Sequence, residues 1–282
     1  MDPIVLLLVL GSAILHASWN ALMKVGGDPL IRLSIINLTC GLIALPVLFF
    51  VPLPAPDSWG LLALSVLLHN VYYLLLVQSY KVGDLSFAYP LARGSAPLLV
   101  AILSFIFAGE GLSPLGIVAV SLICAAILSL ALTGRSRDAG WRPTLLALGT
   151  GVSIAAYTTS DGLGARASGH AIGYVMTLFV LECLPLVAFA AWRRGALFAE
   201  TFRRNWKPAF LAGFFAFLGY AIVVWALGRE QMTFVSALRE TSVIVAALIG
   251  TRLLGEPFGI KRVAAAAAVA AGVVLLNVAP TA

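Results

Sequence analysis

Apolar stretches long enough to cross a membrane follow one another along almost the whole 282-residue chain. A helix needs about 20 apolar residues to span the hydrocarbon core of a bilayer. Because backbone polar groups in lipid must be satisfied within their own segment, we predict an all-α polytopic membrane protein with ten transmembrane helices. Gly, Pro and charged residues separate the predicted helices, which cover residues 3–24, 30–51, 59–80, 85–108, 113–133, 143–165, 170–192, 207–228, 232–254 and 258–278.

The composition excludes a soluble enzyme and a disordered chain. Charged residues make up 11% of the sequence and hydrophobic residues 61%, whereas soluble domains carry about a quarter charged residues. The three cysteines, Cys40, Cys124 and Cys183, lie in apolar runs. We expect them to be buried thiols, and we expect no disulfide, no bound metal and no cofactor.

The basic residues predict the orientation in the membrane. If the N-terminus faces outward, only Arg166 and Arg229 lie on the outer side, whereas fourteen basic residues lie in inward turns or at inward helix ends. By the positive-inside rule, both termini are then non-cytoplasmic, in a bacterial-type inner membrane. The charges are spread over separate turns, which favours contact with anionic lipid over a nucleic-acid site. The inward residues are Lys24, Arg32, Lys81, Arg135, Arg137, Arg142, Arg193, Arg194, Arg203, Arg204, Lys207, Arg252, Lys261 and Arg262.

The sequence also contains an internal repeat with an offset of 146 residues. We predict two five-helix halves, 1–135 and 143–279, joined by a cytoplasmic linker at 135–142. An odd number of helices in each half gives the halves opposite topologies, and such inverted repeats place a substrate site between them near the midplane. The repeat aligns Arg93 with Arg239, Gly109 with Gly255, and Glu110 with Glu256.

An arginine-containing helix ending in Gly-Glu, present twice in a ten-span chain of this length, resembles the EamA branch of the drug/metabolite transporter superfamily. The resemblance covers nearly the whole chain and implies a basket-like ten-helix fold that exports or exchanges small metabolites. The aromatic amino-acid exporters look closest among its branches, because of the His, Trp and Tyr residues inside the spans. The halves also differ, since Pro90, Gly94 and Pro97 of the first are Ser236, Glu240 and Val243 in the second.

Polar and aromatic residues within the spans form stripes at helical spacing. We predict that they line a central substrate cavity between the halves, because small-molecule sites combine apolar or aromatic walls with a few polar groups. The alternative is that the aromatic residues belong to interfacial belts or fill helix contacts. The predicted substrate-binding residues are His16, Trp19, Asn20, His69, Tyr72, Tyr73, Tyr89 and Tyr157.

Four charged residues within the spans suggest further roles. Arg93 and Arg239 could each bind a carboxylate through the planar guanidinium, or each could bond to backbone carbonyls at a gate. Glu240 points about 100° away from Arg239 around the helix, so it is not expected to be its partner. Glu182 could carry a proton for coupling, or it could pair with His16, His69 or an arginine and hold helices together. Asp161 is expected near the outer end of its helix, in contact with water.

These features favour a secondary transporter of neutral, above all aromatic or bulky apolar, amino acids, working by alternating access. We expect it to be a monomer or a homodimer that contacts a small-molecule substrate and lipid, but no nucleic acid. One alternative is a cationic-drug or multidrug exporter that uses Glu182. Another is an intramembrane enzyme with His16 or His69 as a base, although neither has a nearby acid on its own helix. A nucleotide-binding P-loop is missing from the sequence, which argues against ATP drive within this chain.

Overall fold

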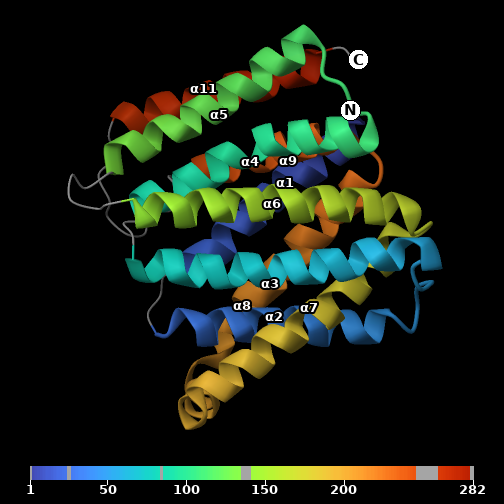
Figure 1. Ribbon diagram of the computed structural model, residues 1–282, viewed down its shortest axis with the longest axis vertical. Coiled ribbons are helices and arrows are strands. Elements are labelled where there is room, and N and C mark those ends of the chain that lie inside the picture. The colour runs from blue at the N-terminus through green and yellow to red at the C-terminus, as the bar shows by residue number, and fades with distance from the viewer. Residues whose placement is uncertain (1, 24–26, 83–84, 135–140, 246–259, 280–282) are drawn as a thin grey trace.

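The computed structural model describes residues 2–23, 27–82, 85–134, 141–245 and 260–279. These residues fold into long helices with short connections (Figure 1). Gly255, Glu256, Lys24 and most of the predicted linker lie outside the described residues. The helices are α1 (Pro3–Met23), α2 (Pro29–Val47), the 3-10 helix η1 (Pro56–Ser58), α3 (Trp59–Val82), α4 (Leu85–Ala108), α5 (Pro114–Gly134), α6 (Arg142–Ala167), α7 (Ala171–Arg194), α8 (Ala196–Leu227), α9 (Met232–Arg239) and α11 (Ile260–Val278).

The described helices have the lengths and surfaces of a multi-span membrane protein. Seven of them are long and apolar enough to cross a bilayer. Large apolar side chains such as Leu7, Phe105 and Trp192 are exposed, and a soluble monomer rarely exposes so many of them. The three cysteines are buried, as predicted.

The helices pack mainly as pairs that join the two halves of the chain. The most extensive of these contacts are α3 with α6, α4 with α6, α1 with α8, α2 with α7, and α5 with α11. In Figure 1, α5 and α11 lie together along one side of the bundle, α2 and α7 lie on the opposite side, and α1 and α6 lie between them. The middle of the bundle is therefore built from both halves.

Two predicted helices differ from the structure. The helix predicted at 207–228 begins earlier, at Ala196. Basic residues such as Arg203 and Lys207 predict a turn between spans, but they lie exposed along α8, and Arg and Lys are good helix formers. The span predicted at 232–254 is interrupted after Arg239, and helix resumes at 242–245. At this break the N–H groups of Glu240 and Thr241 each bond to a carbonyl three residues back, at 3.1 Å, the tighter spacing of a 3-10 turn.

The Gly-Glu pair of the first half has an architectural role. Gly109 has a φ of 66°, a left-handed conformation that glycine adopts without strain, and it ends α4. The Glu110 carboxylate then accepts a hydrogen bond from the Met232 N–H at 2.8 Å and forms an ion pair with Arg166. Glu110 thereby connects the end of α4 to the start of α9 and to the end of α6.

Candidate functional site

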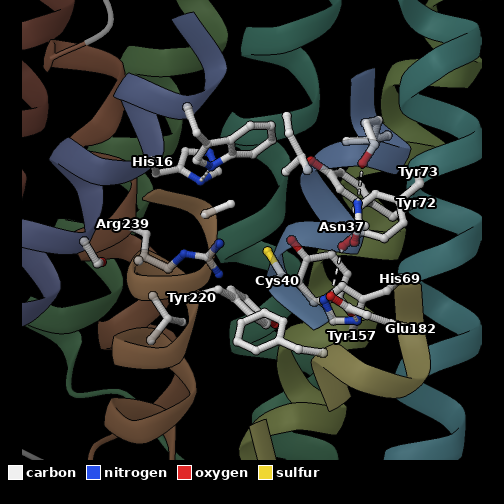
Figure 2. Close-up of a pocket in the computed structure, with 18 residues that line it drawn as sticks. His16, Asn37, Cys40, His69, Tyr72, Tyr73, Tyr157, Glu182, Tyr220 and Arg239 are labelled. Carbon is white, nitrogen blue, oxygen red and sulfur yellow. Dashed lines mark hydrogen bonds and ion pairs between the residues drawn. The ribbon is translucent and has the colours of Figure 1, made fainter. Parts of the chain in front are cut away.

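A cavity lies at the centre of the bundle, lined by residues from both halves (Figure 2). Most of the predicted site residues meet there, although they come from five different helices. His16 and Tyr72 also line a second, smaller cavity and so form part of the wall between the two. The predicted residues that line the central cavity are His16, Trp19, His69, Tyr72, Tyr73, Tyr157, Glu182 and Arg239.

Aromatic rings form much of the cavity wall. The His69 ring stacks on Tyr157 with centroids 4.0 Å apart, and Tyr72 meets Tyr157 edge-on at 5.5 Å. On α1, the Trp19 and His16 rings are perpendicular at 5.3 Å, and the indole N–H donates to His16 Nδ1 at 3.2 Å. These edge-on and stacked contacts are favourable between rings, and they form two groups of rings that line the cavity, one on α1 and one on α3 and α6.

Arg239 is the last residue of α9, and its guanidinium points into the cavity (Figure 2). The guanidinium carbon lies 5.3 Å from the centre of the Tyr220 ring. Within the described part of the chain, no Asp or Glu carboxylate comes within 4.0 Å of its nitrogens. The guanidinium also forms a hydrogen bond with the Tyr157 side chain. The cavity therefore contains a cation whose N–H groups could bind an anionic group.

Glu182 on α7 lines the opposite side of the same cavity (Figure 2). Its Oε1 accepts a hydrogen bond from the Tyr73 hydroxyl at 3.3 Å. Its Oε2 lies 3.7 Å from His69 Nδ1 and accepts no hydrogen bond from any described residue. The contacts with Tyr73 and His69 fit both predicted roles, a proton carrier and a residue that holds helices together.

Arg93 lies at the equivalent position in the first half but does not line the central cavity. Its nitrogens contact both carboxylate oxygens of Glu240, at 2.9 and 3.1 Å, and both side chains are buried. Glu240 was not expected to pair with its neighbour Arg239, and in the fold it reaches the arginine of the other half. The planar edge of Arg93 that could take a carboxylate is thus already occupied by Glu240.

Asp161 was expected to contact water, and this expectation is wrong. Asp161 is 0% exposed, and its carboxylate accepts hydrogen bonds from Ser65, Tyr174 and Tyr220. The tyrosines come from α7 and α8, which cover this end of α6. Position along a helix does not determine contact with water when neighbouring helices enclose the helix end.

Two other predicted residues lie outside the central cavity. Asn20 lines neither cavity, and its side-chain amide donates to the backbone carbonyl of His16 at 2.9 Å. Tyr89 lines the second cavity together with Arg93. Within the described ranges, no three His, Cys, Asp or Glu side chains are grouped so that they could hold a metal ion.

Several residues that line the central cavity were not predicted from the sequence. Asn37 is a polar amide in the middle of an apolar span, and that signal could have identified it. Tyr220 lies in a predicted helix with many aromatic residues, so its ring gave no distinct signal. Cys40 and Phe179 are apolar residues in apolar runs, and the sequence does not distinguish them from ordinary core residues. The lining residues that were missed are Ser12, Leu33, Ile36, Asn37, Cys40, Phe179, Ala216, Gly219, Tyr220 and Val223.

Comparisons with known proteins agree with this architecture. The sequence profile of the EamA-like transporter family matches the chain twice, at residues 3–132 and 141–278. A solved crystal structure, titled only as that of a protein, aligns over 98% of each chain with a TM-score of 0.79 and 12% sequence identity. At that identity the likeness shows a shared fold and nothing about a substrate. A search of curated proteins finds no match.

Proposed function

This chain belongs to the EamA-like transporter family, and from that premise we propose that it exports or exchanges neutral amino acids, above all aromatic or bulky ones. Membership makes it a secondary transporter of small molecules in a membrane, and not an enzyme. The observation that carries the proposed substrate is the position of two charged groups. Arg239 and Glu182 lie on opposite sides of one aromatic-walled cavity.

A zwitterion matches this arrangement of charge. The guanidinium of Arg239 can hold a carboxylate through two parallel hydrogen bonds, and the free Oε2 of Glu182 can accept from an ammonium group. The rings of Tyr72, Tyr157 and Trp19 can then pack against an aromatic or apolar side chain. Each part of an aromatic amino acid thus finds a complementary group.

The same charges disfavour the cationic-drug alternative. A cation would be attracted by Glu182 but repelled by Arg239 across the cavity, and such repulsion is strong where water is excluded. A simple anion would meet the converse penalty at Glu182. A molecule that carries both charges satisfies both groups, which is the reason we favour amino acids.

We propose that transport proceeds by alternating access between two halves, 1–135 and 143–279, joined by the cytoplasmic linker 135–142. Ten helices with opposite topologies in the two halves are supported by the double family match and by the packing, in which α1 with α8 mirrors α3 with α6. The break after Arg239 supports a site at the interface, since transporters commonly bind substrate at discontinuous helices. The basic residues support an inner membrane location with both termini non-cytoplasmic.

Uptake into proteoliposomes tests the proposed substrate. Labelled L-tryptophan and L-phenylalanine are compared with tryptamine and indole-3-propionate, which keep the ring but lack the carboxylate or the ammonium group, respectively. We expect saturable uptake of the two amino acids, with tryptamine and indole-3-propionate each transported poorly. Protein-free liposomes provide the background. Equal uptake of tryptamine, or no saturable uptake of either amino acid, contradicts the proposal.

A further inference from the structure

His69 lies between two buried carboxylates. Its Nδ1 is 3.7 Å from Glu182 Oε2, and its Nε2 is 3.9 Å from Asp161 Oδ2. The three groups come from α3, α7 and α6, and their side chains are at most 4% exposed. Glu182 and His69 line the cavity, whereas Asp161 does not. The three groups therefore form a line that leads from the cavity into the helix bundle.

The carboxylates of Asp161 and Glu182 accept different numbers of hydrogen bonds. Asp161 accepts from three hydroxyl groups, those of Ser65, Tyr174 and Tyr220, and these replace the water that a buried anion loses. Glu182 accepts one hydrogen bond, from Tyr73 at 3.3 Å, and its Oε2 receives none from the described residues. Glu182 is consequently the carboxylate that most needs a proton or a cation.

His69 is held so that both of its ring nitrogens face acceptors. Nδ1 lies 3.0 Å from the backbone carbonyl of Ser65, which can only accept a hydrogen bond. The ring is fixed by stacking on Tyr157 and by edge contact with Tyr220. The titratable and charged groups that surround the three residues are Tyr73, Tyr157, Tyr174, Tyr220, Cys40, Cys183 and, across the cavity, Arg239.

We propose that Glu182, His69 and Asp161 form a proton-binding site whose proton is exchanged for the ammonium group of the substrate. This inference rests on the proposed function, because it places that ammonium group at Glu182. Without substrate, Glu182 carries the proton and Asp161 is the anion. With substrate, Glu182 is an anion paired with the ammonium group, and the proton has left.

The exchange keeps the charge at the Glu182 end of the cavity constant, which matters because an uncompensated charge in a low-dielectric interior is costly. One positive charge enters there with the ammonium group and one leaves as the proton, while the negative charge of the substrate carboxylate pairs with Arg239. In the route we propose, the neutral ring of His69 begins with its proton on Nε2, and Nδ1 accepts from the Ser65 hydroxyl, which lies 3.1 Å away. Nε2 gives its proton to Asp161, and Nδ1 takes the proton of Glu182. The ring ends neutral with Nδ1–H donating to the Ser65 carbonyl at 3.0 Å, and Asp161 is the group from which the proton leaves.

Infrared spectroscopy tests the site without depending on transport. Difference spectra of the purified protein between about pH 5.5 and 9, where exposed carboxyl groups are ionised, should show the carbonyl band of a protonated carboxylic acid. We expect Glu182→Gln to remove one such band, and the exposed Glu200→Gln to retain it. L-tryptophan at the lower pH should remove the same band from the wild-type protein, which keeps the test valid if Glu182→Gln does not fold. If Glu182→Gln keeps every carboxylic acid band of the wild-type protein, the proposal is overturned.

Proton movement in proteoliposomes tests the coupling. With a pH-sensitive dye inside, an imposed L-tryptophan gradient should move protons against the direction of tryptophan. Asp161→Asn should abolish this proton movement yet retain exchange of labelled for unlabelled tryptophan, because exchange needs no net proton release. The exposed Asp57→Asn is the matched control and should keep both. Tryptophan movement without proton movement in the wild type overturns the inference, as does intact coupling in Asp161→Asn.

The two experiments separate the possible failures. If no amino acid is transported, the proposed function fails, and the Glu182→Gln infrared spectrum still decides whether Glu182 binds a proton. If tryptophan is transported but the infrared band is missing from the wild-type protein, the proposed function stands and the proton site is wrong.

Discussion

Arg93 and Arg239 occupy equivalent positions in the two halves, yet the fold uses them differently. Arg93 lies within the unbroken helix α4 and is bound to Glu240 of the other half. Arg239 is the last residue of the short helix α9 and points into the cavity. A repeated residue can therefore keep its position in both halves while only one copy remains available to a ligand.

The residue that follows each arginine explains the difference. The first half has Gly94, which packs so closely on α5 that an added Cβ would lie 2.9 Å from Leu128 Cγ. The second half has Glu240, which has room to reach across the interface to Arg93. Glu240 therefore pairs with the arginine of the opposite half and not with its neighbour Arg239.

The largest expected effect comes from breaking the buried ion pair. Arg93→Gln leaves the Glu240 carboxylate buried without its cation, and we expect the free energy of unfolding to fall by about 3–5 kcal/mol. Chemical unfolding of the protein in detergent measures this loss. The double variant Arg93→Gln with Glu240→Gln should regain most of the stability. If the double variant is no more stable than Arg93→Gln alone, the pair does not hold the halves together.

A smaller effect is expected where the first half has no room for an acid. Gly94→Ala forces a methyl group against Leu128, and such overpacking costs about 1–3 kcal/mol of unfolding free energy. Gly11→Ala is the matched control, because an added Cβ there meets nothing within 4 Å. The same unfolding assay compares the two variants, and equal stability would show that close packing is not what keeps residue 94 a glycine.

Helical periodicity could predict what lies on one helix but not what meets between helices. The spacing of His16 with Trp19, and of His69 with Tyr72, correctly placed each pair on a cavity-facing stripe. Periodicity also indicated that Glu240 points away from Arg239. It could not identify Arg93 as the partner, since 147 residues separate the two.

The break after Arg239 and the burial of Asp161 were missed for a related reason. Residues 232–254 read as one apolar run, and the polar contacts that accompany the break come from another helix. Asp161 is enclosed by Tyr174 and Tyr220, which belong to the two helices that follow α6. Both features depend on tertiary neighbours that a hydropathy pattern does not contain.

The smallest effect on stability is expected for Arg239→Gln. Removing a buried cation that has no carboxylate partner among the described residues leaves no anion unpaired. We therefore expect the free energy of unfolding to stay within about 1 kcal/mol of the wild-type value. The effect should appear in substrate binding instead, and this contrast with Arg93→Gln separates the two roles.

The most direct test of these roles is the transport of L-tryptophan and of tryptamine by the wild type and by Arg239→Gln. A hydrogen bond to a charged group contributes about 1.5–3 kcal/mol, so the KM for tryptophan should rise about 10- to 100-fold. The KM for tryptamine, which has no carboxylate, should not rise. An equal rise for both compounds, or no rise for tryptophan, would contradict the assignment of Arg239 to the substrate carboxylate.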